Sequence, residues 1–584
     1  MRAIVSLLVA VCGAVIASIL LGFALGGLGA ASAQVSLILG AALGLFAWFS
    51  IPRDAIPALE SPRGWIAWSV VVIFALFALR AFCWVIFFRY GEIGYLSVNN
   101  IGDLPLHVTF IRYFANGAPF WPDNPIFAAV PLRYPFGVDL FNSLLLLVGV
   151  DLIRGLVWAG LIGALATGVM LWRWGGAFAI AGFLFNGGFA AWKIFQEGYG
   201  GDLQSEIAWK SIPLALFVTQ RGLLYAIPVG LALLWSWRAR FFRDERGLPF
   251  WIEVLLYSTL PIFHLHTFLF LSAMLGGWLI LSGCSGCGPF RSVELRGKIV
   301  RLVTYSVLPA TLLVSVLTGG FRGANAIHLK PGWMQGAQNP FVFWGENFGL
   351  LPLLVVALLV WLWRKRDDLR ERTEQFAFVI PAVALFLVCC FVMFAPWEWD
   401  NTKLFLWSYL AILPALWAML RKAWPWLRWA ICFTLFFAGF ISLIEGLGLP
   451  RHSLTMAQRS IVDGMEAPLH ALPVTATFAC FPTYDHPLLL LGRKVVAAYD
   501  GHLSSHGIRY EETKGQLEEL LRGKPGWEER VRKLGVDYLF WGQQEEKEYG
   551  PSLAPWAGKA ELVAQGEWGR IYDLRPFKEK PLEP

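Results

Sequence analysis

Residues 4–24 read "IVSLLVAVCGAVIASILLGFA", an apolar run without a charged side chain. About 20 residues of α-helix cross the hydrocarbon core of a bilayer, so this run has the length of one transmembrane helix. It is too long for the apolar part of a typical secretory signal peptide, and we expect it to remain as the first span. Runs of the same kind recur along the chain as far as residue 446.

The composition agrees with many such spans. Of the 584 residues, 57% are hydrophobic and only 15% are charged, which is too apolar for a soluble protein of this length. The net charge is +7, but the Arg and Lys residues gather in short loops between apolar runs. The positive-inside rule explains such loops without nucleic acid as a partner. The sequence therefore predicts a polytopic α-helical membrane protein.

The apolar runs predict about thirteen spans within residues 1–446, followed by a small α/β domain over residues 447–584. Basic loops place the N-terminus in the cytoplasm and the C-terminal domain outside the membrane. Segments 88–137 and 194–211 are both predicted on the extracytoplasmic side, so an even number of crossings must separate them. Residues 138–193 between them contain three apolar runs. One of them is therefore expected to re-enter or to lie in the interface, with a break at "FNGGF" (Phe185–Phe189).

The C-terminal segment shows the mixed periodicities of a small soluble domain. The predicted elements are a strand at "LGRKVVAAY", an amphipathic helix at "YEETKGQLEELLRG", a helix and buried strand at "WEERVRKLGVDYLFWG", and a hairpin at "AELVAQGEWGRIYDL". The segment contains no nucleophile elbow, P-loop or dinucleotide fingerprint. Its sequence therefore points to no chemistry of its own.

The segment "NNIGDLPLHVTFIRYFANG" (Asn99–Gly117) lies on the predicted outer side and contains an acid and an imidazole four residues apart. In a helix, Asp103 and His107 share one face, with Pro105 tolerated in the first turn. One interpretation is a general base or a ligand, and the other is the wet polar face of an interfacial helix. An ionisable group at membrane depth costs roughly 2.5–3.5 kcal/mol, which favours a functional role for this pair.

Further candidates lie in the other predicted outer segments, where all nine histidines also fall. The five histidines of the C-terminal domain need no special reason. Cationic groups can bind phosphate, acids can orient hydroxyls, and aromatic rings can stack on sugars or anchor at lipid headgroups. Interfacial snorkelling explains Arg221 equally well, and an ion pair explains the group around Lys403. The candidate substrate-binding residues are Arg112, Tyr113, Arg133, Tyr134, Asp202, Glu206, Arg221, His264, His266, Glu398, Asp400 and Lys403.

Metal binding has little support in the sequence. Cys284 and Cys287 form a single Cys-x-x-Cys pair without a second pair, which is weak evidence for zinc. Asp103 with His264 and His266 is a second ligand set, for which hydrogen bonding by the histidines is the alternative. The cofactor therefore stays open, with a divalent cation (Mg or Mn) as its one candidate.

Three features of the chain resemble the GT-C superfamily of integral-membrane glycosyltransferases. An acid-bearing outer loop follows an early span and leads into "LRYPFG" (Leu132–Gly137). An apolar run with "FNGGF" precedes a second outer loop with acids. The segments "LLGRKVVAAYDGHLSSHGIRYEE" and "LGVDYLFWG" look like the C-terminal domains of uncharacterised bacterial members. Together these features extend over nearly the whole chain.

The resemblance implies an enzyme that moves a sugar from a polyprenyl-phosphate-linked donor to a glycan, lipid or protein acceptor, with inversion, on the extracytoplasmic face. By position, Asp103 matches the family's catalytic or acceptor-positioning acid, and His107 stands beside it. The family's metal-binding Asp-x-Asp form is absent, because Asp-Leu-Pro-Leu-His takes its place. We expect a bacterial inner membrane with a periplasmic C-terminal domain.

Two alternatives come from other classes: a transporter or flippase of a lipid or lipid-linked glycan, and an inactive membrane scaffold. Transporters place ionisable groups near the bilayer midplane and contain inverted repeats. Here the ionisable groups gather at one predicted face and no repeat is evident. The sequence therefore favours the transferase.

Overall fold

The computed structural model describes residues 1–53, 59–96, 102–193, 204, 207–283, 292–320, 327–365, 369–448, 453–550 and 554–578. Ten helices in these ranges are long and apolar enough to cross a membrane. They are α1 (Arg2–Leu25), α2 (Ala30–Ser50), α3 (Trp65–Cys83), α6 (Leu152–Leu184), α9 (Gly222–Trp237, extended by a π-helical turn at Arg238–Phe242), α11 (Leu265–Gly283), α12 (Val293–Leu317), α15 (Leu369–Cys389), α16 (Thr402–Leu420) and α17 (Pro425–Leu447).

Among the described residues, fewer than thirteen helices have the length and apolar composition of a membrane span. Helices α13 (Pro340–Phe348) and α14 (Leu351–Arg364) meet at 82° and count as one further, broken span. The apolar helices α5 (Gly137–Leu147) and α10 (Phe250–Phe263) are too short to pass the same test. The described chain is thus a polytopic helical protein with ten or eleven candidate spans, and a total of about thirteen stays a prediction.

Helix α6 changes direction before the predicted break. Gly175 and Gly176 leave the helical conformation, and Gly176 has φ +64°, a value that favours glycine because it has no Cβ. The second part of the helix ends at Leu184, immediately before "FNGGF". The apolar region 138–193 therefore contains a short helix, one long helix and a bent continuation.

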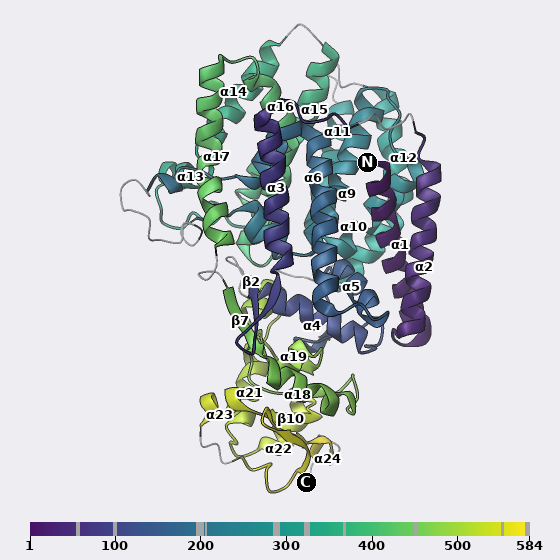
Figure 1. Cartoon of the computed structure of the whole chain (residues 1–584), viewed down its shortest axis with the longest axis vertical. Coiled ribbons are helices and arrows are strands. Elements are labelled where there is room, and N and C mark those ends of the chain that lie inside the picture. Colours follow the sequence, from purple (N-terminus) through teal and green to yellow (C-terminus); the bar gives the residue numbers. More distant parts are fainter. Residues whose placement is uncertain are drawn as a thin grey trace.

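One end of the bundle carries the elements that position the candidate site (Figure 1). Helix α4 (Asp103–Ala115) begins there and packs against α5. The hairpin of β3 (Asp123–Asn124) and β4 (Phe127–Pro131) joins these two helices in sequence. We call this end the site end, and the C-terminal domain extends beyond it (Figure 1).

A three-stranded antiparallel sheet connects the two parts of the chain. Strand β2 (Glu92–Leu96) lies between β1 (Ile86–Arg89) and β7 (Ser453–Gln458). Strand β7 is the first element after α17, so the chain returns to the segment that precedes α4. This pairing holds the start of the C-terminal segment beside the site end.

The rest of the C-terminal segment builds a five-stranded sheet. Its strands, in spatial order, are β11 (Glu561–Gly566), β12 (Gly569–Asp573), β10 (Tyr538–Trp541), β8 (Thr477–Ala479) and β9 (Lys494–Val495). Three sequence predictions are confirmed: helix α21 (Glu511–Leu521), helix α22 (Trp527–Leu534) with strand β10, and the β11–β12 hairpin. The remaining helices are α18 (Arg459–His470), α19 (Pro487–Leu490), α20 (Asp500–Ser505), α23 (Gln543–Tyr549) and α24 (Arg575–Lys578).

Strand β9 is shorter than the predicted strand "LGRKVVAAY". Only Lys494 and Val495 belong to the sheet. The backbone amides of Val495 and Ala498 donate instead to the carbonyls of Pro125 and Ile126 in the β3–β4 hairpin. The C-terminal domain therefore bonds through its backbone to the loop between α4 and α5.

Candidate functional site

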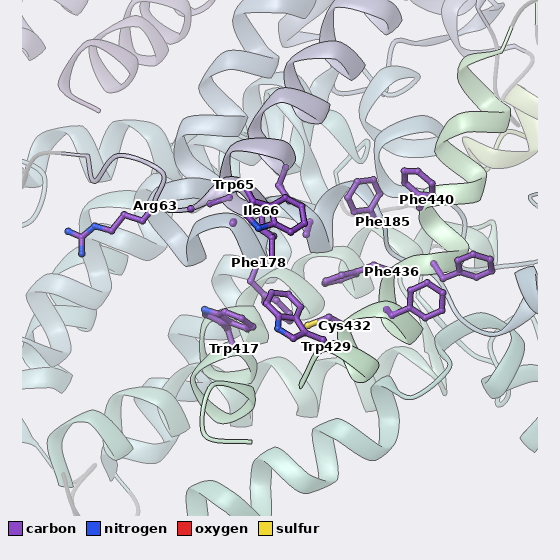
Figure 2. Close-up of a pocket in the computed structure, with 17 residues that line it drawn as sticks. Arg63, Trp65, Ile66, Phe178, Phe185, Trp417, Trp429, Cys432, Phe436 and Phe440 are labelled. Carbon is purple, nitrogen blue, oxygen red and sulfur yellow. The ribbon is translucent and has the colours of Figure 1, made fainter. Parts of the chain in front are cut away.

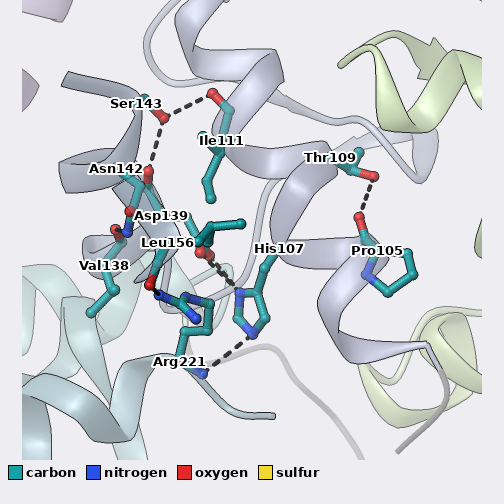
Figure 3. Close-up of polar contacts among 10 residues, drawn as sticks. All are labelled: Pro105, His107, Thr109, Ile111, Val138, Asp139, Asn142, Ser143, Leu156 and Arg221. Atoms are coloured by element: carbon teal, nitrogen blue, oxygen red, sulfur yellow. Dashed lines mark hydrogen bonds and ion pairs between the residues drawn. The ribbon is translucent and has the colours of Figure 1, made fainter. Parts of the chain in front are cut away.

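A buried histidine–aspartate pair joins α4 to α5 (Figure 3). The Nδ1 atom of His107 lies 2.9 Å from both carboxylate oxygens of Asp139, and each side chain is only 2% exposed. A carboxylate only accepts hydrogen bonds, so Nδ1 carries the proton and donates it. The Ser143 hydroxyl adds a second connection, because it donates to the Ile111 carbonyl at 2.9 Å. The two helices are thus held in one fixed relation.

Arg221 lies beside this pair, in the turn before α9. Its backbone N–H donates to Nε2 of His107 at a long 3.5 Å, so Nε2 is the accepting nitrogen of the ring (Figure 3). The side chain is fully buried, and its Nη2 donates to the Leu156 carbonyl at 2.9 Å. Its Nε and Nη1 have no hydrogen-bond partner among the described residues. Two charged donors in the interior are therefore left unsatisfied, which costs free energy unless a bound group accepts from them.

Three acids approach one phenol at Tyr134. Burial raises the pKa of Tyr134 well above its usual value, and the negative charges of Asp103, Asp139 and Asp400 raise it further. The ring lies 6.2 Å from the ring of His107. The hydroxyl therefore stays protonated at neutral pH.

Asp103 is the first residue of α4, where the positive end of the helix dipole favours a carboxylate. Pro105 falls in the first turn, as the sequence predicts, because no intrahelical bond is lost there. The side chain of Asp103 is partly buried. A carboxylate in this position can accept a proton from a group bound beside Tyr134.

A second polar group lies at the corners that lead into α11 and α16. His264 has extended backbone at the end of α10, and its ring lies 5.8 Å from that of His266. The Nε2 atoms of both histidines are buried without a partner in the described chain. Lys403 forms an ion pair with Asp400 at 3.0 Å. The negative charge of Asp400 also contributes to the raised pKa of Tyr134, so this group acts electrostatically on the first one.

Two predicted site residues of α4 contact the C-terminal domain instead. Arg112 pairs with Glu466 of α18 at 2.7 Å. Tyr113 is 1% exposed, and the backbone at this point packs closely against Gly492. A phosphate contact for Arg112 and a sugar contact for Tyr113 stay predictions.

Other predicted residues lie at the edge of the site or outside the described residues. Arg133 is exposed, with its guanidinium packed against Gly319. Glu398 forms an ion pair with Lys330 at 2.8 Å. The predicted candidates outside the described residues are Asp202 and Glu206 of the second acidic loop and the cysteine pair Cys284 and Cys287.

The sequence interpretation missed three members of the site. Asp139 lies inside an apolar run, and an acid in such a run is itself a sign of function that was available in the sequence. His502 and His506 received no special role in the sequence interpretation among the five histidines of the C-terminal domain. Both reach the site end, and the ring of His506 lies 5.0 Å from that of Tyr134. No local signal distinguishes them from the other histidines of the domain.

The sequence left a divalent cation as the one candidate cofactor, and the described residues contain no group arranged to hold it. Within the described residues, no three His, Cys, Asp or Glu side chains come close enough together to hold a metal ion. Asp103, His264 and His266 therefore form no metal site in this structure.

An apolar cavity of about 640 Å³ lies between α3, α6, α16 and α17 (Figure 2). Aromatic rings line it, and the rings of Phe178 and Trp417 stack at 4.9 Å. Arg63 lies at its edge. A cavity of this composition suits an aliphatic or isoprenoid chain and cannot hold a charged headgroup.

Comparison with known proteins gives structural neighbours only. No protein-family model and no curated protein sequence matches the chain. The crystal structure of an oligosaccharyltransferase from Archaeoglobus fulgidus in the apo form has a TM-score of 0.39 and 12% identity, over 82% of this chain and 69% of that one. Its complex with Zn and sulfate has a TM-score of 0.37 and 13% identity, over 81% and 68%.

Proposed function

We propose that the protein is a membrane glycosyltransferase that moves a sugar from a polyprenyl-phosphate-linked donor to an acceptor. The observation that carries the proposal is Arg221, fully buried with two unpartnered N–H donors beside the His107–Asp139 pair. Charged guanidinium N–H groups make strong hydrogen bonds to phosphate oxygens. A buried cation with open donors is therefore suited to an anionic group that arrives with the substrate.

The reaction is an inverting displacement at C1 of the sugar. Asp103 takes the proton of the acceptor hydroxyl, the acceptor oxygen bonds to C1, and the bond from C1 to the phosphate oxygen breaks. Polyprenyl phosphate leaves with the electron pair of that bond. Arg221 and Lys403 stabilise the charge on the departing phosphate. His107, whose Nε2 carries the lone pair, is the second proton acceptor of the site.

Asp139 has two roles in this scheme. It fixes the tautomer and orientation of His107 through the Nδ1–H bond. Its negative charge also favours the charged form of Arg221, which burial alone disfavours. The acid that the sequence interpretation overlooked thus supports both the base and the phosphate-binding cation.

The carrier lipid explains why the site lies at one end of a membrane bundle. The apolar cavity between α3, α6, α16 and α17 can hold part of the polyprenyl chain while the phosphate reaches the site end. The positive-inside rule makes that end extracytoplasmic, in a bacterial inner membrane with the N-terminus in the cytoplasm. In this arrangement residues 1–446 are the membrane unit, and residues 447–584 are a domain on the acceptor side.

The test measures sugar release and transfer by the purified protein in nanodiscs, with a panel of radiolabelled polyprenyl-phosphate sugars. The variants are Asp103→Asn and Arg221→Gln. Asp151→Asn and Arg154→Gln make the same chemical changes at exposed positions near the start of α6. Asn also caps a helix well, so the first control keeps its structural role.

We expect both site variants to lose at least about 100-fold in turnover while the controls stay close to wild type. Wild-type turnover that persists in Asp103→Asn would remove that acid from the chemistry. No turnover of any donor by wild type, combined with movement of the lipid between leaflets, would replace the proposal with a flippase.

A further inference from the structure

Helix α20 and its C-cap residue bring two histidines of the C-terminal domain, His502 and His506, to the site end of the bundle. The imidazole of His502 lies against Gly102, where an added Cβ would come within 2.5 Å of Nε2. One turn later, the ring of His506 lies 5.0 Å from that of Tyr134. The two imidazole rings stack at 6.5 Å. The C-terminal domain therefore forms one side of the cluster around Tyr134.

His506 has an unsatisfied polar atom in this cluster. Its Nδ1 is buried and has no hydrogen-bond partner within the described ranges. Burial lowers the pKa of His506 to about 4, with Asp400 opposing this shift and Lys403 adding to it. The imidazole is therefore neutral at pH 7 and offers a hydrogen bond rather than a charge.

A neutral ring nitrogen suits a hydroxyl better than a phosphate. Phosphate requires positive charge, which Arg221 and Lys403 provide, whereas a nitrogen lone pair accepts from O–H. A buried nitrogen without a partner costs about 1–3 kcal/mol, and a bound hydroxyl recovers this free energy. The C-terminal domain lies beyond the membrane helices, so its residues meet a group that arrives from the aqueous side (Figure 1).

We propose that His506 is an acceptor-binding residue whose Nδ1 accepts a hydrogen bond from a hydroxyl of the acceptor sugar. This inference rests on the proposed glycosyl transfer and adds the C-terminal domain to its machinery. The hydroxyl bound by His506 is a neighbour of the one that Asp103 deprotonates. The donor contacts belong to the membrane unit alone, and acceptor binding requires both units.

The experiment compares two substitutions that retain different ring atoms. In His506→Asn the side-chain amide lies near the position of Nδ1, and in His506→Gln it reaches the position of Nε2. His470→Gln is the matched control, because His470 is an exposed histidine at the end of α18 in the same domain. The full chain is used in nanodiscs, with the polyprenyl-phosphate sugar panel as donors and alkyl glycosides of defined sugars as acceptor probes.

We expect His506→Gln to raise the KM for the alkyl glycoside about tenfold, because one hydrogen bond to a buried atom is lost. The KM for the donor and the release of sugar to water should not change. His506→Asn and His470→Gln should stay within about twofold of wild type. Equal effects of the Asn and Gln variants, or an altered donor KM, would overturn the assignment, because a packing role does not distinguish the two ring atoms.

Saturation-transfer NMR of the same glycosides gives a readout that needs no turnover. The signal should be present with wild type and with Asp103→Asn, and strongly reduced with His506→Gln. Glycosides that bind in this pattern without being glycosylated would refute the proposed function and leave the acceptor site standing. If sugar transfer occurs and His506→Gln binds the glycosides as well as wild type does, this inference alone is refuted. The same conclusion follows if wild type transfers sugar but binds none of the glycosides.

Discussion

Asp139→Asn tests the centre of the proposed site. The substitution keeps the size of the side chain and removes the charge that accepts the His107 Nδ1–H bond. Both side chains are almost fully buried, so water cannot replace the lost interaction. A hydrogen bond to a charged group contributes about 1.5–3 kcal/mol, and an amide retains only part of it. We therefore expect the free energy of opening of α4 and α5 to fall by about 2 kcal/mol.

Hydrogen exchange measured by mass spectrometry reports this change locally. A loss of about 2 kcal/mol corresponds to roughly 30-fold faster exchange in peptides from α4 and α5, because about 1.4 kcal/mol equals a factor of ten. Peptides from α12 and from the five-stranded sheet should exchange as in wild type. Asp151→Asn is the control, since it makes the same change at an exposed helix cap.

The same variant should lower sugar transfer by about 100-fold or more, because the imidazole loses its fixed tautomer. Removing Asp139 also leaves the buried Arg221 without the negative charge that favours its charged form. The double variant Asp139→Asn/Arg221→Gln should therefore be less destabilised than the sum of the two single variants. Unchanged exchange in α4 and α5 of Asp139→Asn would refute the reasoning, since the pair would then not hold the helices together.

Two further predictions concern the cavity and the C-terminal domain. Ala181 lines the apolar cavity, and a larger side chain there would fill part of it. We therefore expect Ala181→Trp to reduce kcat/KM about fivefold or more for long-chain donors and to leave kcat/KM for two-isoprene donors unchanged. Equal effects on both donors would contradict the assignment of the cavity to the lipid chain. Burial opposes protonation of His486, but Cys480 and Glu545 raise its pKa to about 10. The resulting stabilisation is complete below the unfolded pKa of about 6.5 and is lost as pH rises through about 10. The thermal unfolding midpoint of the C-terminal domain, followed by fluorescence, should therefore fall between about pH 6.5 and pH 10 in wild type and fall less in His486→Gln. Parallel plots of this midpoint against pH for the two proteins would count against the His486–Glu545 ion pair.

The parts of the fold that follow from local pattern could be predicted from the sequence. Helices α1 and α17 follow from apolar runs of sufficient length, and the β11–β12 hairpin follows from a turn between alternating strands. The predicted strand "LGRKVVAAY" forms only in part. Its second half bonds with Pro125 and Ile126, a partner about 370 residues earlier that leaves no trace in the local pattern.

The candidate site shows the same limit more strongly. Asp103 and His107 were selected because they share one helix turn, which is a local property. The partner of His107 is Asp139, 32 residues further on, in a run that reads as a plain span. His506 reaches Tyr134 only because the C-terminal domain folds back onto the hairpin between α4 and α5. Contacts of this kind depend on tertiary packing, which one sequence does not encode in any short pattern.

The sheet of β1, β2 and β7 also determines when the site can exist during biosynthesis. Glu92 of β2 contacts Thr455 of β7, which is synthesised 363 residues later. At about 5–20 residues per second, β2 waits roughly 20–70 s as an unpaired edge strand, a state prone to wrong pairing. A ribosome that stops before β7 therefore releases a bundle with a complete set of spans and an open strand edge. Quality-control proteases that recognise exposed edges would then remove unfinished chains before they could bind lipid-linked sugar.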